Sequence, residues 1–226
     1  MKKSFLFISD FDGTLSEKDF YRVLIDRHYQ ADRARLYADW ENKTVTDLEY
    51  LSRLFAGIGR DETGIDEEID YISLDPHAKA VIDHVQRLGG DFVVISAGTD
   101  YYIRRVLKKY AIRNVRIFAN PGVYANRGIK ITADPAGRYY SPMYGIDKAK
   151  VTRDLIKDYR TVWFAGDSRP DLEAALLTDV IFAKGQLQGL LNAQKRDYVA
   201  IDDFSDIENY LGCHEETLRT SSRDSS

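Results

Sequence analysis

Cysteine is nearly absent from this chain: Cys213 is the single one among 226 residues. An internal disulfide is therefore impossible, which excludes the disulfide framework of small secreted proteins. Long hydrophobic runs are also missing, because a charged residue interrupts every apolar segment well before the roughly 20 residues that a membrane-spanning helix requires. With only MKKSFLFIS ahead of the first aspartate, the N-terminus does not resemble a secretory signal. We expect a cytoplasmic protein with no membrane partner.

The chain has no surplus of positive charge. Lysine and arginine total 32 against 36 aspartates and glutamates, which gives a net charge of −4, whereas nucleic-acid-binding domains usually show the opposite balance. We therefore expect no nucleic-acid partner, and any phosphate group that the protein binds has to be held by local side chains. What the chain does have is an apolar fraction of 44%, enough to bury a substantial core.

The apolar residues gather in short runs rich in β-branched or aromatic side chains, which are typical of strands buried on both faces. Five are clear and a sixth is weaker: Phe5–Ser9, Phe92–Ser96, Val115–Ala119, Val162–Ala165, Val180–Ala183 and the weaker Tyr198–Ile201. Amphipathic stretches that predict helices lie between most of them: Pro76–Leu88, Tyr101–Tyr110, Lys148–Tyr159 and Asp171–Leu177. This alternation predicts an α/β fold, a three-layer Rossmann-like core in which helices cover both faces of a parallel sheet.

Two segments interrupt the alternation. Residues 16–75 contain no convincing strand and three amphipathic stretches, Phe20–Tyr29, Val45–Phe55 and Thr63–Ile72, which predict a helical cap inserted after the first strand. The second segment contains VYANRGIKITAD, where the turn at Asn126-Arg127-Gly128 predicts a small β-hairpin. We expect a core formed by residues 1–15 and 76–214, a cap of residues 16–75, and a disordered tail at 215–226, which is polar and lacks aromatics.

The first apolar run ends in two aspartates, in FLFISDFDGTLS. In an extended chain Asp10 and Asp12 project to one side, while Phe11 faces the other way. Two like charges so close repel each other unless a cation or a substrate lies between them. Gly13 lets the backbone turn away and leaves room for a ligand, and Thr14 adds a hydroxyl. Because ligands of open α/β sheets bind beyond the carboxyl ends of the strands, we expect a binding site here.

Three further polar elements lie, like Asp10 and Asp12, just past a predicted strand or at the start of a predicted helix. Ser96 ends one strand and is followed by a turn, where a hydroxyl and free backbone amides form an anion-binding site. Lys148 begins a helix after a polar loop. Asp167 follows another strand, and Asp171 comes four residues later. Each element lies just past a strand or at the start of a helix, so we expect all of them to meet at one edge of the sheet.

In this order, Asp10-Phe11-Asp12-Gly13-Thr14, Ser96, Lys148 and Gly166-Asp167-x-x-x-Asp171 resemble the four motifs of the haloacid dehalogenase-like (HAD) phosphohydrolase superfamily. The resemblance spans Ser9 to Asp171. One such motif arises easily by chance, whereas four ordered motifs at strand ends and helix starts are specific. The resemblance implies a phosphatase whose helical insert corresponds to the C1 cap of the superfamily, acting on a small phosphorylated metabolite.

The resemblance also implies a role for each residue of the first and last motifs. Asp10 would be the nucleophile that carries an aspartyl-phosphate, and Asp12 the general acid and base. Mg²⁺ would be held by the Asp10 carboxylate, the Asp12 backbone carbonyl and Asp167. Gly13 and Asp171 would support this site, with Asp171 either orienting metal-bound water or pairing with the motif lysine.

The resemblance to the superfamily also implies that the two middle motifs bind the phosphate group. Ser96, Ala97 and Lys148 would contact the phosphoryl oxygens and neutralise the charge that spreads over them in the transition state. Lys148 is preferred over Lys150 because the family lysine precedes the apolar stripe of its helix at the equivalent point.

Two substrate classes stay open. A helical cap of this length resembles the phosphoserine phosphatase branch. Within it, the stretches Ser96–Tyr102 and Gly166–Ala175 are similar to the methionine-salvage phosphatases that act on 2-hydroxy-3-keto-5-methylthiopentenyl-1-phosphate. Phosphoserine phosphatases usually carry GDGxND in the last motif, from which GDSRPD departs. They also commonly place a glutamate, which meets the substrate ammonium, where this chain has Asp19.

Other functions use the same residues. A catalytically silent phosphate-binding or regulatory protein of this fold is one alternative, although such a protein needs neither a nucleophile nor a general acid. Phosphoryl transfer to an acceptor other than water is another. We expect a monomer or a homodimer.

Overall fold

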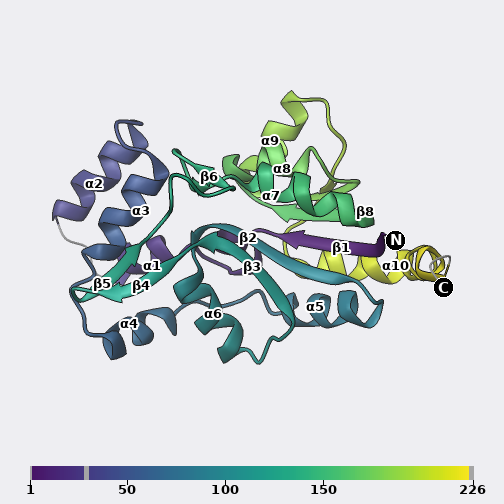
Figure 1. Ribbon diagram of the computed structural model, residues 1–226, viewed down its shortest axis with the longest axis horizontal. Coiled ribbons are helices and arrows are strands. Elements are labelled where there is room, and N and C mark those ends of the chain that lie inside the picture. The colour runs from purple at the N-terminus through teal and green to yellow at the C-terminus, as the bar shows by residue number, and fades with distance from the viewer. Residues whose placement is uncertain (1, 28–30, 224–226) are drawn as a thin grey trace.

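Six parallel strands form the central sheet of the computed structural model, which describes residues 2–27 and 31–223. Their order is β10-β9-β8-β1-β2-β3, of which Figure 1 labels β8, β1, β2 and β3. The strands are β1 (Lys3–Ser9), β2 (Asp91–Thr99), β3 (Val115–Asn120), β8 (Tyr159–Gly166), β9 (Val180–Ala183) and β10 (Val199–Ala200). The five strong strand predictions and the weaker sixth are confirmed. Because β1 is central, its carboxyl end lies beside the ends of β2 and β8.

The side chains of β1 alternate between two hydrophobic layers. Phe5 and Phe7 pack into the layer under α5, α6 and α10, and Leu6 and Ile8 pack into the layer under α7, α8 and α9. Figure 1 shows these two groups of helices on opposite faces of the sheet. Their bounds are α5 (Ala78–Arg87), α6 (Asp100–Lys109), α7 (Lys148–Leu155), α8 (Leu172–Ala175), α9 (Gly185–Ala193) and α10 (Phe204–Arg223). The predicted three-layer α/β core is therefore confirmed.

Four helices form the cap that follows β1: α1 (Phe20–Arg27), α2 (Ala31–Glu41), α3 (Asp47–Ala56) and α4 (Glu62–Ile69). The chain enters and leaves the cap through neighbouring linkers, since Ser16 and Leu74 pair as an antiparallel bridge. Three of these helices match the predicted amphipathic stretches, although the last two residues of the stretch predicted to end at Tyr29 lie outside the described residues. Helix α2 was not predicted.

The predicted hairpin is present and packs on the cap. Strands β4 (Gly122–Ala125) and β5 (Gly128–Ile131) are joined by Asn126 and Arg127, whose positive φ values of 50° and 63° fit the tight turns that match strand twist. Arg127 donates to the Gly59 carbonyl, and a Cβ at Gly128 would lie 2.4 Å from the Ala56 carbonyl oxygen. The hairpin therefore packs against the cap helix α3, although its residues fall within the segment assigned to the core. A second short pair, β6 (Tyr140–Ser141) and β7 (Gly145–Ile146), follows it.

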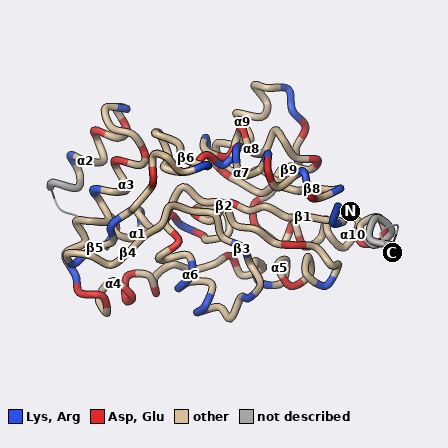
Figure 2. Tube along the Cα trace, viewed as in Figure 1, with Lys and Arg blue, Asp and Glu red and all other residues tan. Residues whose placement is uncertain are grey.

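Ion pairs connect the cap to the core beside the hairpin. Figure 2 shows the acidic segments of α4 next to basic segments of α6. Arg105 on α6 contacts Glu62 at 3.1 Å and Asp66 at 2.7 Å. The hairpin and these pairs, together with the two linkers, place the cap over the carboxyl edge of the sheet.

The prediction of a disordered tail from Glu215 is wrong for the residues that the structure describes, because α10 continues to Arg223. The apolar stripe of Phe204, Ile207 and Leu211 continues for two more helical turns to Leu218, which is 4% exposed. His84 on α5 also contacts Glu215 at 2.7 Å. Residues 224–226 lie outside the described part of the chain. Among the described helices, none combines the length and the apolar character that crossing a bilayer demands.

Candidate active site

The predicted site residues converge on the carboxyl edge of the sheet. Asp10 follows β1, Ser96 and Ala97 lie near the end of β2, Asp167 follows β8, and Lys148 begins α7. These five residues and Asp12 line one cavity of about 1190 Å³, whose opposite wall is formed by the cap. Parallel strands bring their carboxyl ends together, so residues more than a hundred positions apart in the chain meet here.

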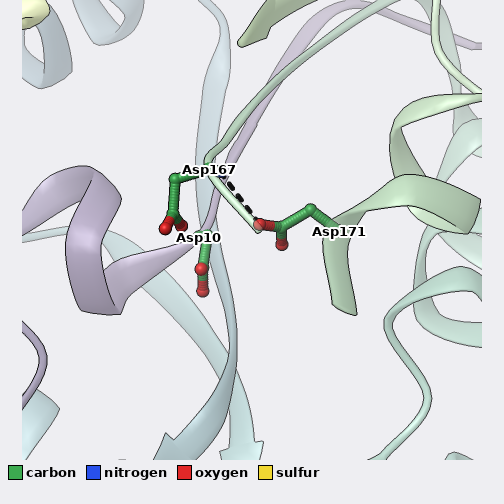
Figure 3. A group of neighbouring side chains, drawn as sticks. All are labelled: Asp10, Asp167 and Asp171. Atoms are coloured by element: carbon green, nitrogen blue, oxygen red, sulfur yellow. Dashed lines mark hydrogen bonds between the residues drawn. The ribbon is translucent and has the colours of Figure 1, made fainter. Parts of the chain in front are cut away.

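Three carboxylates form an acidic cluster at this cavity, two of them in its wall and the third, Asp171, buried behind them. One oxygen from each of Asp10, Asp167 and Asp171 lies within 4.8 Å of the others (Figure 3). Gly13 makes the close approach possible: its φ of +76° is unfavourable for residues with a side chain, and a Cβ there would lie 3.0 Å from Asp167 Oδ2. Thr14 Oγ1 donates to Asp167 Oδ1 at 3.0 Å. The cluster is therefore built by the turn that the first motif forms.

Lys148 is the one cation in contact with the acidic cluster among the described residues. Its Nζ lies 2.6 Å from Asp10 Oδ1 and 2.7 Å from Asp171 Oδ1, and the residue is 4% exposed. Burial alone would lower the pKa of Lys148, but the two carboxylates raise it, so the ammonium stays charged. Asp171 is held in turn by the backbone N–H groups of Asp167 and Ser168. Of the two roles considered for Asp171, the structure shows the pairing with Lys148.

The cluster carries more negative charge than Lys148 compensates. Burial, with repulsion from Asp171, raises the pKa of Asp10 well above its ordinary value, and the same two causes raise the pKa of Asp167 to about 7. Asp10 Oδ1 accepts from the Phe11 N–H and from Lys148, whereas no described residue hydrogen-bonds its Oδ2. Carboxylate oxygens that lie close together form the donor set that a hard divalent cation prefers.

The Asp12 side chain lies beside this cluster and has a different environment. Oδ1 accepts from the Phe20 N–H at 3.1 Å, and Oδ2 accepts from Ser96 Oγ at 3.1 Å and Tyr102 Oη at 2.5 Å. Burial, with repulsion from Asp19, raises the pKa of Asp12 to about 6 even though the three hydrogen bonds lower it. A carboxyl group with such a pKa can both donate and accept a proton near neutral pH.

Ser96 contacts Asp12 in this structure. Its hydroxyl donates to Asp12 and accepts from the Gly98 N–H at 2.9 Å, and the residue is fully buried. Its predicted role in phosphate binding therefore stays a prediction. Ala97, the other predicted phosphate-binding residue of this strand end, lines the cavity.

Sequence reasoning missed Tyr102 as a residue of the site. Tyr102 lies on the buried stripe of α6, where a tyrosine looks like ordinary core packing. The signal that could have found it is Gly98, since a Cβ at Gly98 would lie 1.7 Å from the Tyr102 hydroxyl and 2.8 Å from Asp12 Oδ2. A glycine at that place is what allows the contact.

The fold and the site together are those of a capped α/β phosphatase with a buried carboxylate at the end of its central strand. Comparison with known families agrees. The model of the haloacid dehalogenase-like hydrolases matches residues 7–176, more than half of the chain. The chain therefore belongs to the haloacid dehalogenase-like hydrolase family, and the family predicted from the four motifs is confirmed.

Curated relatives point to one kind of phosphatase. The chain is 26% identical over 207 residues to the 2-hydroxy-3-keto-5-methylthiopentenyl-1-phosphate phosphatase of Exiguobacterium sp. strain AT1b, covering 90% of this chain and 95% of that one. It is 21% identical over 216 residues to the enzyme of the same name from Brevibacillus brevis, covering 93% and 96%. The predicted resemblance to methionine-salvage phosphatases is therefore confirmed as a resemblance.

Solved structures confirm the capped fold. A phospho-aspartyl intermediate analogue of phosphoserine phosphatase superposes with a TM-score of 0.67 at 18% identity, covering 92% of this chain and 99% of that one. Cytosolic 5'-nucleotidase IIIB bound to cytidine gives a TM-score of 0.64 at 16% identity, covering 96% and 86%. At these identities the likeness concerns the fold alone.

Proposed function

We propose that the protein is a Mg²⁺-dependent phosphomonoesterase that hydrolyses a small phosphorylated metabolite through an aspartyl-phosphate intermediate. The observation that carries this proposal is the position of Lys148, which lines the cavity together with Asp10 and Asp167 and bridges Asp10 to the buried Asp171. A protein that only binds phosphate has no use for three clustered carboxylates, because they repel the ligand unless a cation is bound.

In the first half of the reaction, Asp10 Oδ2 attacks phosphorus and the ester bond to the leaving oxygen breaks. Asp12 gives its proton to that oxygen, so the leaving group departs as a neutral alcohol. Lys148 compensates charge on Asp10 and on the phosphoryl oxygens, which would otherwise repel each other by about 4 kcal/mol per pair of unit charges 4 Å apart at an effective dielectric of 20.

In the second half, water attacks the aspartyl-phosphate while Asp12 accepts its proton. The bond between phosphorus and the Asp10 oxygen breaks, which releases inorganic phosphate and restores the carboxylate. Tyr102 and the Phe20 N–H orient Asp12 for both transfers. Ser96 and the backbone at Ala97 meet the phosphoryl oxygens when substrate enters, since both residues lie at the edge of the same cavity.

The acidic cluster suits Mg²⁺. The ion would be held by Asp10, by the Asp12 backbone carbonyl and by Asp167, and when bound it polarises the phosphoryl group and offsets its negative charge. Gly13 keeps this place free of side-chain atoms. Asp171 keeps Lys148 in position and accepts hydrogen bonds from backbone N–H groups of the last motif.

For the substrate, we propose the phosphate ester named in the curated relatives, 2-hydroxy-3-keto-5-methylthiopentenyl-1-phosphate. Phosphoserine is the second candidate, because the fold over 92% of this chain is similar to that of a phosphoserine phosphatase. The test is a rate measurement on both esters and on p-nitrophenyl phosphate, with Mg²⁺ and with EDTA. Turnover that requires Mg²⁺ supports the phosphatase; binding of the esters without turnover of any would favour the silent phosphate-binding protein.

A further inference from the structure

The cap contributes a group of aromatic side chains to the cavity wall. Tyr21 from α1, Tyr37 and Trp40 from α2, and Tyr50 from α3 all line the cavity, and we refer to these four residues as the aromatic pocket. The Trp40 and Tyr50 rings stack with centroids 4.8 Å apart, and Tyr21 meets both at 5.7 and 5.8 Å. The indole N–H of Trp40 donates to Asp47, so this side chain offers the cavity only apolar surface.

The hydroxyl of Tyr50 is a buried polar group. Tyr50 is 1% exposed, and its Oη has no hydrogen-bond partner among the described residues. Burial raises the pKa of Tyr50, so the phenol stays protonated and can both donate and accept. Buried hydroxyls in folded proteins are nearly always hydrogen-bonded. Since Tyr50 lines the cavity, a bound molecule can supply the missing partner.

Two of the charged residues in this part of the cavity form an ion pair. Asp19 and Arg22 line the cavity, act electrostatically on Tyr50, and contact each other at 3.1 Å. Neither offers an uncompensated charge to a ligand. A zwitterionic leaving group would have to separate the pair, whereas an uncharged one leaves it intact. Asp19 also raises the pKa of Asp12, so the pair lies close to the group that protonates the leaving oxygen.

We propose that the aromatic pocket selects an uncharged leaving group, with Tyr50 as a specificity-determining residue that hydrogen-bonds a hydroxyl or carbonyl of the substrate alcohol while Trp40 packs on its apolar end. The substrate class is a phosphate monoester of a neutral alcohol that carries at least one oxygen function along an apolar chain. This inference rests on the proposed phosphatase activity and adds to it what the cap recognises.

The test compares ester pairs that differ by one group. Pentyl phosphate is measured against five-carbon monophosphates that carry a single carbonyl or hydroxyl at carbon 2, 3 or 4, and phosphoserine is included. For the unmodified protein we expect at least one oxygenated chain to exceed pentyl phosphate in kcat/KM by about tenfold, as one added hydrogen bond provides. In Tyr50→Phe this ratio should fall to about one. Tyr124→Phe, an exposed tyrosine of β4, is the control and should keep the ratio.

A series of alkyl phosphates of increasing length tests, without a mutation, whether Trp40 packs on the apolar end of the substrate. From ethyl to pentyl phosphate, kcat/KM should rise about fourfold for each methylene that Trp40 covers. The proposal is overturned if Tyr50→Phe keeps the preference, if oxygenated chains gain nothing, if the series is flat, or if phosphoserine is preferred. In each of these cases p-nitrophenyl phosphate would still be hydrolysed with Mg²⁺ and the proposed phosphatase would stand. Absence of all turnover would overturn both.

Discussion

Tyr102 donates its phenolic hydrogen to Asp12 Oδ2 at 2.5 Å, past Gly98, where a Cβ would lie 1.7 Å from the Tyr102 hydroxyl. The tyrosine is fully buried and comes from α6, while Asp12 follows β1. This contact fixes the carboxyl group that the proposed mechanism uses twice. It also lowers the pKa of Asp12 against the effect of burial, which keeps that value near 6.

Replacing Tyr102 by phenylalanine should therefore change rate and pH dependence together. Without the hydroxyl, the pKa of Asp12 rises above about 6, because a hydrogen bond to the ionised carboxylate is lost. We expect kcat for p-nitrophenyl phosphate to fall by about tenfold, the effect of one charge-assisted hydrogen bond, and the alkaline limb of the pH profile to move to higher pH.

The adjacent tyrosine provides the control for this variant. Tyr101 donates to Glu62 in the cap, away from Asp12. Tyr101→Phe should leave the profile in place. A Tyr102→Phe enzyme with an unchanged limb would show that the tyrosine only packs.

Asp10→Asn removes the proposed nucleophile while keeping the size of the side chain. Turnover should fall by about a thousandfold or more, because a carboxamide cannot form the phosphoryl ester. The protein should remain folded, since the change removes one charge from a crowded acidic cluster. Steady-state assays and circular dichroism check both points, with Asp83→Asn, a surface residue paired with Lys79, as the control. Retention of wild-type turnover would exclude the covalent mechanism.

Much of this site could be predicted because its chemistry is local. Asp10, Lys148 and Asp167 each stand at the end of a buried strand or the start of a helix, and the parallel sheet brings such positions to one edge. The hairpin was predictable for a similar reason. Asn126 tolerates the positive φ that its turn requires, and the flanking residues alternate.

Other features depend on tertiary contacts that no local pattern shows. Helix α2 has few apolar residues, and its Leu36, Tyr37 and Trp40 are partly buried where they pack against the large hydrophobic cluster. The end of α10 is polar in sequence, yet Leu218 and Glu215 find partners on the core. The hydrogen bond from Ser96 to Asp12 depends on where the turn after β1 lies, and that turn precedes Ser96 by more than eighty residues.

Mg²⁺ should stabilise the protein more strongly at alkaline pH. The pKa of Asp167 is raised from 3.8 to about 7 in the folded chain, so in the absence of metal this group favours the folded state below pH 3.8, and that contribution is lost as pH rises through about 7. A bound divalent cation offsets the repulsion that causes the loss.

The rise in Tm on adding Mg²⁺ is therefore expected to be larger at about pH 8 than at about pH 5.5, where protons compete with the metal. Differential scanning calorimetry at both pH values measures it. Asp167→Asn should reduce the Mg²⁺ effect at both, while Asp70→Asn, whose side chain is 70% exposed, should not. An equal Mg²⁺ effect at the two pH values would contradict the assignment of Asp167 as a ligand.

Two lysines in the first turn of α7 allow the replacement of a buried lysine to be compared directly with that of an exposed one. Lys148 is enclosed between Asp10 and Asp171, whereas the Lys150 side chain is 49% exposed and contacts Asp147 at 3.6 Å. Lys148→Met leaves two buried carboxylates without their cation, and removal of one partner from a buried ion pair costs about 3–5 kcal/mol. We expect the free energy of unfolding at neutral pH to fall by about that amount, and turnover to be lost.

Acidification should recover part of the lost stability of Lys148→Met, because protonation of Asp10 removes the uncompensated charge. Lys150→Met should change the free energy of unfolding by less than about 1 kcal/mol, as exposed pairs do. Urea denaturation of both variants at about pH 5 and pH 8 separates the two effects. If Lys148→Met were as stable and as active as Lys150→Met, the ammonium at position 148 would serve neither the fold nor the phosphate, and the site described here would have to be assigned to other residues.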